Sequence, residues 1–122
     1  MSAAHYKLDN MTAILDYNKV QANSYIYDAI ALEPLEDKWR AFGWNVISID
    51  GHDFEEILQA YYTARRINRN GKPTIIIAHT VKGRGIEFAE FETPWHTFVH
   101  DHDVIKKAFE SLAKYYGRKE AK

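Results

Sequence analysis

The fold is decided by one stretch, Asn70-Gly71-Lys72-Pro73-Thr74-Ile75-Ile76-Ile77-Ala78, in which a turn-forming cluster precedes an unbroken apolar run. Glycine and proline in such a cluster end whatever element comes before them. A short β-branched run without polar alternation is typical of a strand that is buried on both faces of a parallel sheet. We therefore expect residues 74–78 to form a buried strand of such a sheet.

Two further segments have the pattern of strands. Residues 11–17 are a short apolar, partly β-branched run, and residues 44–49 alternate apolar and polar side chains before Asp50-Gly51. The segment from Asn18 to about Pro34 is expected to be a loop. The sequence thus predicts three strands.

Three helices are predicted from apolar residues at helical spacing. The first covers residues 35–42 and is closed by the following glycine, and the second begins at the capping residue Asp53 and runs to about residue 68. The third covers about residues 103–116, with Asp103 as its cap and Gly117 as its end.

The order strand, helix, strand, helix, strand, helix predicts an α/β fold, a three-layer α/β/α arrangement around a mostly parallel sheet. The 122 residues suffice for one domain and no more. Three parallel strands, however, leave two uncovered edges, so we expect the sheet to continue into strands from elsewhere. Residues 1–122 are accordingly expected to be part of a domain.

Composition excludes several classes of function. The net charge of -1 provides no basic field for nucleic acid or an anionic membrane surface, and the absence of cysteine excludes disulfide scaffolds and thiolate metal sites. With no signal-peptide core and no apolar run long enough to cross a bilayer, we expect a cytoplasmic protein. Aromatic residues make up 14% of the chain, so either the core is unusually aromatic or part of the surface meets another chain.

Ligands of open α/β sheets bind beyond the carboxyl ends of the strands. The residues there are Asp16-Tyr17-Asn18, Asp50-Gly51-His52-Asp53 and His79-Thr80-Val81-Lys82-Gly83-Arg84-Gly85. Each segment is polar, and each could equally be an ordinary solvated loop. Gly83-Arg84-Gly85 suggests a phosphate-binding loop but matches no nucleotide-binding fingerprint.

A histidine-rich segment is a second candidate site. His96, His100 and His102, with Asp101 and Asp103 between them, have the residue types and close spacing of a metal site. We favour a simpler interpretation, because Asp101 or Asp103 is needed as a helix cap, neighbouring histidines in a polar loop usually face water, and the sequence shows no second ligand cluster.

Six segments share their pattern with one known family: residues 3–21, Leu32-Glu33-Pro34-Leu35, Lys38-Trp39-Arg40-Ala41-Phe42-Gly43-Trp44, Ile49-Asp50-Gly51-His52-Asp53-Phe54, Gly71-Lys72-Pro73-Thr74 and His79-Thr80-Val81-Lys82-Gly83. Over about residues 3–97 the chain resembles the thiamine-diphosphate-binding domain of the transketolase family, in particular the short transketolases made as separate N-terminal and C-terminal subunits. This resemblance implies the thiamine-diphosphate-binding fold, of which the chain would be about half.

The resemblance also implies a cofactor and the residues around it. Thiamine diphosphate would be held through Mg²⁺ or Ca²⁺, with the Asn18 amide and the Val20 backbone carbonyl as metal ligands, and hard oxygen donors suit these cations. The implied cofactor-binding residues are Asn18, Val20, Gln21, His79 and His96. His96 is also the implied catalytic residue, at the phosphates and the bound sugar, where it can donate a hydrogen bond or move a proton.

The chain departs from the family pattern at several points. The Gly-Asp-Gly motif that supplies the charged metal ligand is absent, Ala22-Asn23-Ser24 replaces the usual Ile-Asp-Gly, and Thr97 replaces the glycine of Trp-His-Gly. The domain that binds the aminopyrimidine and provides the activating glutamate is also absent. Two neutral oxygen ligands cannot hold a strongly hydrated cation and a diphosphate well, so we expect the isolated chain to be inactive.

The resulting hypothesis is a component of a split transketolase that moves a two-carbon ketol unit between sugar phosphates. The cofactor and cation would be shared with partner chains, or with copies of this chain, that supply the Gly-Asp-Gly half and the pyrimidine-binding domain. Two alternatives stay open: a non-catalytic remnant or assembly subunit, and another thiamine-diphosphate enzyme such as deoxyxylulose phosphate synthase.

Overall fold

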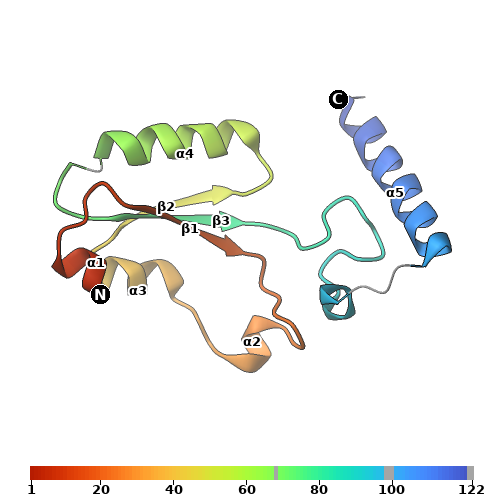
Figure 1. Ribbon diagram of the computed structural model, residues 1–122, viewed down its shortest axis with the longest axis horizontal. Helices are drawn as coiled ribbons and strands as arrows, with labels where there is room; N and C mark the ends of the chain where they lie inside the picture. Colours follow the sequence, from red (N-terminus) through yellow and green to blue (C-terminus); the bar gives the residue numbers. More distant parts are fainter. Residues whose placement is uncertain (68, 98–100, 121–122) are drawn as a thin grey trace. The chain divides into compact units, whose positions relative to one another are not determined.

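The computed structural model describes residues 1–67, 69–97 and 101–120, and its elements are labelled in Figure 1. The chain divides into two compact units. We call Met1–Asn18 with Leu32–Thr80 the sheet unit, and Lys19–Ala31 with Val81–Lys122 the C-terminal unit.

The sheet unit is built on three parallel strands, β1 (Thr12–Tyr17), β2 (Asn45–Asp50) and β3 (Thr74–His79). Their order is β1-β3-β2, so the last strand in the sequence is the central one. Ile76 of β3 lies between Ile14 of β1 and Ile47 of β2 in the register. The predicted parallel α/β fold is confirmed.

The central strand is buried as the apolar run predicted. Residues 74–78 are all buried, because β3 has a strand on each side and helices above and below. Ile75, Ile76 and Ile77 are among the largest fully buried side chains of the described chain. The core of the sheet unit is therefore centred on β3.

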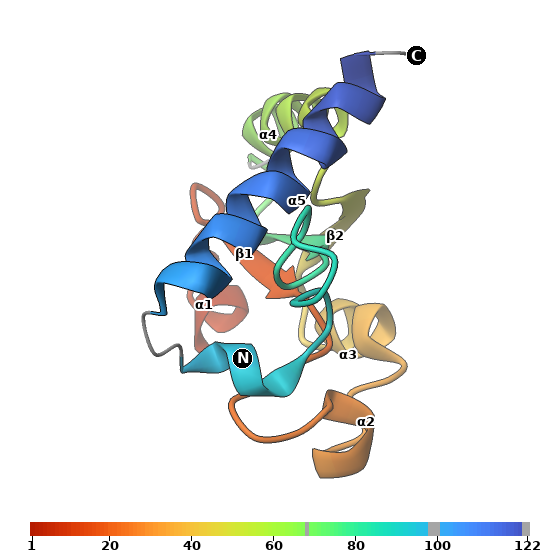
Figure 2. The ribbon, with the colours of Figure 1, turned by 90° about the vertical axis from the view of Figure 1, so that its right-hand side faces the viewer.

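Helices cover both faces of the sheet. Helix α4 (Phe54–Ile67) lies on one face, where its small residues Ala60 and Ala64 allow close packing on Ile76. The short helix α1 (Ser2–His5) and helix α3 (Leu35–Ala41) lie on the other face (Figures 1 and 2). The three layers of the predicted α/β/α arrangement are thus present in the sheet unit.

Capping fixes the start of α4. The Asp53 carboxylate accepts hydrogen bonds from the backbone N–H groups of Glu55 and Glu56, at 2.8 and 3.1 Å. The Glu56 carboxylate accepts from the N–H of Asp50 at 2.7 Å, which ties the end of β2 to the helix. The predicted start is confirmed, while residue 68, the predicted end, lies outside the described residues.

The C-terminal unit contains α2 (Ile26–Ala29), a 3-10 turn η1 (Thr93–His96) and α5 (His102–Glu120). The expectation of an uninterrupted loop over residues 18–34 was wrong at α2, a single helical turn too short to produce a periodic pattern. No helix within residues 1–67, 69–97 and 101–120 is long and apolar enough to span a membrane.

Both predicted limits of the last helix need correction. Asp101, not Asp103, is the cap: its carboxylate accepts from the N–H of Asp103 at 2.9 Å, and its carbonyl accepts from the N–H of Ile105. At the other end α5 continues through Gly117, which does not take the left-handed conformation that ends a helix.

Candidate functional site

The carboxyl ends of the three strands meet at one edge of the sheet. Tyr17, His79 and Asp50 are the last residues of β1, β3 and β2, and they pair side by side in the register. Asn18 follows Tyr17 directly. The structure therefore brings two of the predicted site residues, Asn18 and His79, to the same edge of the sheet unit.

A carboxylate organises the β1 end of this edge. The Asn18 amide nitrogen donates to Asp16 Oδ2 at 3.3 Å, and the Thr80 hydroxyl donates a short hydrogen bond to Asp16 Oδ1. Asp16 thus holds the Asn18 amide and the residue that follows β3. Thr80 in turn requires Gly51, since a Cβ at Gly51 would lie 2.4 Å from the Thr80 methyl carbon.

His79 is held on the opposite face of the sheet from Asp16. Its Nε2 is 2.9 Å from the Ser48 hydroxyl oxygen, and its ring meets the Tyr17 ring edge-on with 5.5 Å between centroids. Tyr17 donates from its hydroxyl to Glu33 Oε1 at 2.6 Å, and Glu33 Oε2 accepts from the N–H of Leu35 at the start of α3. A connected network of side chains therefore runs along this edge, from Ser48 of β2 through His79, Tyr17 and Glu33 to the start of α3.

The Tyr17 hydroxyl is kept protonated by this network. Its hydrogen bond to Glu33, then its burial and the charge of that carboxylate, raise the pKa of Tyr17 from 10.0 to about 12. At neutral pH Tyr17 is accordingly a fixed hydrogen-bond donor that orients Glu33, and its ring supports His79.

Val20 and Gln21 belong to the C-terminal unit, in a tight turn. Val20 is buried and forms an isolated antiparallel bridge with Tyr25. Gln21 bonds twice to Ser24, from its backbone N–H to the carbonyl at 2.9 Å and from its side-chain amide to the hydroxyl at 2.8 Å. Ala22-Asn23-Ser24, where the family pattern is broken, therefore forms the tip of a well-bonded turn.

His96 lies in η1 of the C-terminal unit, and its Nδ1 is 2.7 Å from Lys82 Nζ. An ammonium group can only donate, so in this contact Nδ1 is the acceptor and the imidazole proton is on Nε2. His96 is thereby oriented with an N–H donor on the nitrogen away from Lys82. The sequence did not reveal this pair, because 14 residues separate its members.

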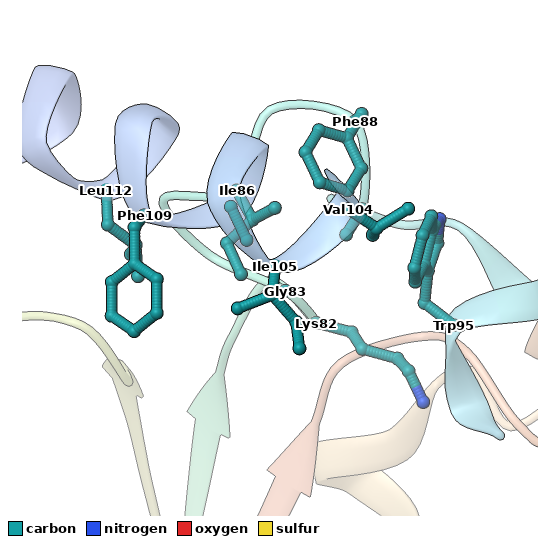
Figure 3. A pocket seen from close by; sticks show the side chains of 11 residues that line it. Lys82, Gly83, Ile86, Phe88, Trp95, Val104, Ile105, Phe109 and Leu112 are labelled. Atoms are coloured by element: carbon teal, nitrogen blue, oxygen red, sulfur yellow. The ribbon is translucent and has the colours of Figure 1, made fainter. Parts of the chain in front are cut away.

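An apolar cavity of about 310 Å³ lies beside Lys82 in the same unit. Figure 3 shows Phe88 and Trp95 at one end of it, Phe109 and Leu112 at the other, and Lys82 at its side. Apart from the Lys82 ammonium, the side chains that line the cavity are aliphatic or aromatic. Such a lining accommodates an apolar group rather than a sugar or a phosphate.

The glycine-rich segment is structural in this unit. Gly83 and Gly85 have positive φ angles, and a Cβ at Gly83 would lie 2.6 Å from the Ala89 carbonyl oxygen. The Gly85 N–H donates to the Glu90 carboxylate at 3.0 Å, and the Gly85 carbonyl accepts from Ser111 of α5. An N–H that is bound to a carboxylate is not a phosphate donor, so the suggested phosphate-binding loop is not supported.

The alternative metal site gains no support from the described residues. Within residues 1–67, 69–97 and 101–120, no three His, Cys, Asp or Glu side chains are grouped so as to hold a metal ion. His100, one of the three histidines of that alternative, lies outside the described residues. An aspartate of this segment does cap α5, as the favoured interpretation predicted, although the capping residue is Asp101 and not the expected Asp103.

The implied metal ligands have the donor atoms that a hard cation prefers, but they carry no negative charge. The Asn18 amide oxygen and the Val20 carbonyl oxygen are the donor types that Mg²⁺ and Ca²⁺ take, yet both are neutral. Asp16 brings a negative charge next to Asn18, but its two oxygens accept from Asn18 and Thr80. Each donor, taken by itself, is of the type that a hard cation accepts, and a carboxylate from elsewhere would be needed to supply the charge.

Comparison with known proteins gives a consistent result. The sequence model of the family described as "Transketolase, thiamine diphosphate binding domain" matches residues 1–117. The 6-deoxy-6-sulfo-D-fructose transketolase subunit SqwG of Clostridium sp. (strain MSTE9) is 44% identical over 114 residues, which are 93% of this chain and 41% of the relative. An apulose-4-phosphate transketolase subunit of Actinobacillus succinogenes is 40% identical over 112 residues, 92% of this chain and 40% of the relative.

Solved structures agree with the sequence relatives. The transketolase of Campylobacter jejuni matches with a TM-score of 0.79 and 34% identity, over 92% of this chain and 17% of that chain. The transketolase of Leishmania mexicana matches in fold with a TM-score of 0.64. The chain thus spans about two fifths of the length of the curated subunits that it matches.

Proposed function

We propose that this chain, which belongs to the transketolase family and carries part of its thiamine diphosphate binding domain, is one component of a split transketolase. Together with partner chains it would transfer a two-carbon ketol unit between sugar phosphates. The observation that carries the proposal is the similarity, over 93% of this chain, to a protein that is itself named as a transketolase subunit. The relatives reported above are all named as transketolases, which favours ketol transfer over the deoxyxylulose phosphate synthase alternative.

The proposed cofactor, thiamine diphosphate, supplies the electron sink for the carbanion chemistry when it is bound. Asn18 would contribute its amide oxygen to the accompanying Mg²⁺, and its orientation by Asp16 supports that role. Val20 would contribute its backbone carbonyl, and Gln21 would shape the turn that presents it.

The two histidines would act around the same group. His96 would donate from Nε2 to phosphate or sugar oxygens, and its contact with Lys82 supports this because it places the proton there. His79 is proposed as a cofactor-binding residue, held in place by Ser48 and Tyr17.

The proposed cation site needs a carboxylate beyond Asn18 and Val20. Asn18 and Val20 bring no negative charge to the cation, whereas Mg²⁺ in such sites is bound through one or two carboxylates as well as substrate phosphates. We propose that a polypeptide with a Gly-Asp-Gly motif supplies the missing carboxylate, and that a further chain or domain supplies the pyrimidine-binding side.

Reconstitution tests this function. The chain is co-expressed with the neighbouring encoded polypeptides that carry Gly-Asp-Gly and the pyrimidine-binding domain, and ketol transfer is measured with and without thiamine diphosphate and Mg²⁺. We expect activity that depends on both cofactors and is absent from the isolated chain. A lack of any complex, or a complex without ketol transfer, contradicts the proposal.

A matched pair of variants makes the test specific for the site. Asn18→Ala removes the proposed amide ligand and should lower activity by about tenfold or more, with a higher Mg²⁺ requirement, as loss of metal-site groups does. Asn23→Ala changes the same residue type at the exposed tip of the turn and should leave activity within about twofold. Equal effects of the two variants would show that Asn18 is not part of the site.

A non-catalytic assembly subunit is the second candidate, favoured by Ala22-Asn23-Ser24 and Thr97 at positions where the family pattern differs. Titration calorimetry of the assembled complex with thiamine diphosphate and Mg²⁺ separates the two. Heat of binding that is lost in Asn18→Ala supports the catalytic role, and an absence of binding supports the assembly role.

A further inference from the structure

One corner of the sheet unit lacks a layer. Ile14 of β1 pairs in register with Ile76 of β3, so both side chains point to the face that carries α4. Ile76 is 2% exposed beneath α4, whereas Ile14 is 54% exposed. Among the described residues of the sheet unit, helix α4 therefore covers β2 and β3 and leaves β1 uncovered on that face.

Helix α4 is apolar on the side next to this corner. Phe54, Leu58, Tyr61 and Tyr62 are 82%, 56%, 48% and 68% exposed, and their spacing of three, four and eight residues makes one stripe. We call these four residues the α4 flank. It lies beside the stripe that contains Ala60 and Ala64, which packs on the sheet.

The α4 flank is turned toward β1. The connection from β2 through α4 to β3 is a right-handed crossover, with β1 and β2 at opposite edges of the sheet (Figure 2). In that geometry, the side of α4 that carries Phe54, Leu58 and Tyr61 faces the space above β1. Ile14 and the α4 flank are thus two walls of the same apolar corner.

The dimensions of the corner suit a helix. Strands lie about 4.8 Å apart and a helix with its side chains is about 10 Å wide, so one helix covers roughly two strands. With α4 above β2 and β3, a further helix of this layer would lie above β1 and pack against the flank of α4. Parallel sheets have such helices on both faces.

We propose that this corner binds an amphipathic helix of the polypeptide that completes the domain, with the apolar side of that helix on Ile14 and the α4 flank. The inference rests on the proposed function. Its occupant is supported by length, because the chain spans only 41% of a relative that matches 93% of it, and the remaining 59% leaves ample sequence for further elements of the layer. It also assigns part of the aromatic excess to an interface, since three of the four flank residues are aromatic.

Thiol labelling tests the location of the interface. The chain has no cysteine, so a single introduced thiol reports on one position. Leu58→Cys on the flank and Gln59→Cys on the exposed polar side of α4 are labelled with a maleimide, in the chain alone and in complex with the Gly-Asp-Gly polypeptide. We expect the complex to slow the labelling of Leu58→Cys by at least about tenfold and that of Gln59→Cys by less than about twofold.

Two matched substitutions to glutamate test how strongly the α4 flank contributes to binding. Leu58→Glu should weaken binding of the same polypeptide about 100-fold, because it buries an unpaired carboxylate, and Gln59→Glu should weaken it less than about threefold. Since Leu58 is exposed, both variants should keep the thermal stability of the chain alone.

A photo-reactive maleimide on Leu58→Cys should cross-link to partner residues spaced three or four apart, as on one side of a helix.

The outcomes separate the two proposals. A complex that forms without protecting Leu58→Cys, or that binds Leu58→Glu as tightly as the wild type, overturns this inference and leaves the proposed function standing. If Leu58→Cys of the chain alone becomes protected from labelling as the chain concentration rises, the occupant is a second copy of the chain. That result also overturns the inference. If no complex forms, the proposed function fails and the inference fails with it.

Discussion

The two units of the chain differ in how they are held together. In the sheet unit β3 is buried along residues 74–78, and Ala60 and Ala64 of α4 pack directly on it. In the C-terminal unit none of the α5 side chains described, residues 102–117, is buried, and the preceding loop is joined to the helix by polar contacts such as that of Ser111 with Gly85. The first unit is supported by a core, whereas the second depends on a few hydrogen bonds and a thin apolar contact.

This difference separates the candidate site residues into two groups. Asn18 and His79 lie on strand ends of the unit with the core, while Val20, Gln21 and His96 lie on turns of the other unit. Positions on strand ends are set by the sheet itself, whereas positions on turns depend on local bonds. We therefore expect the two groups to respond differently to mutation and to binding of partners.

The largest expected effect comes from the core of the sheet unit. Ile76→Ala should lower the free energy of unfolding by about 2–5 kcal/mol, because it opens a cavity between α4 and the sheet. Phe109→Ala in α5, at a side chain that is 69% exposed, should lower it by less than about 1 kcal/mol. Urea denaturation followed by circular dichroism measures both, and equal losses would contradict the contrast between the units.

An intermediate effect is expected at the edge of the sheet. Tyr17→Phe should cost about 1–3 kcal/mol at neutral pH, since Glu33 loses a hydroxyl donor. The pKa of Tyr17 is raised by folding from 10.0 to about 12, so the stability that its proton provides is complete below pH 10 and is lost as the pH rises toward 12. The wild type should therefore lose more stability than Tyr17→Phe between these pH values, and its tyrosinate absorbance should include one late-titrating component that the variant lacks.

The smallest effect is expected at the start of α5. Asp101→Ala should cost about 1 kcal/mol of helix stability, because the N–H of Asp103 loses its acceptor. Asp103→Ala should cost at most about half as much, through the loss of a negative charge in the first turn. Helix content by circular dichroism and amide exchange of α5 measure both, and the reverse order would restore Asp103 as the cap.

The sequence predicted the sheet unit better than the C-terminal unit, for a physical reason. The run Thr74–Ala78 and the helix start at Asp53 are encoded locally, by side-chain period and by a cap next to its helix. Because Asn18 and His79 each directly follow a predicted strand, their common edge followed from the parallel sheet.

The features that escaped prediction depend on contacts between distant residues. Asp16 and Thr80 are 64 residues apart, so their hydrogen bond has no local signal. Gly83 and Gly85 resembled a ligand loop because the sequence shows the glycines but not their distant contacts. A Cβ at Gly83 would meet the Ala89 carbonyl, and the Gly85 N–H is already bound to the Glu90 carboxylate. Gly117 was expected to end α5, but glycine inside a helix is only mildly unfavourable and does not force an end.

The strand order of the sheet has a consequence for how the chain is made. Since β3 lies between β1 and β2, neither of the first two strands has its partner within the described sheet until residues 74–79 have been synthesised. Thr12 must then find Thr74 across most of the sheet unit, a pairing of high contact order that slows folding. During synthesis on the ribosome, β1 and β2 therefore cannot join this three-stranded sheet before β3 has been made.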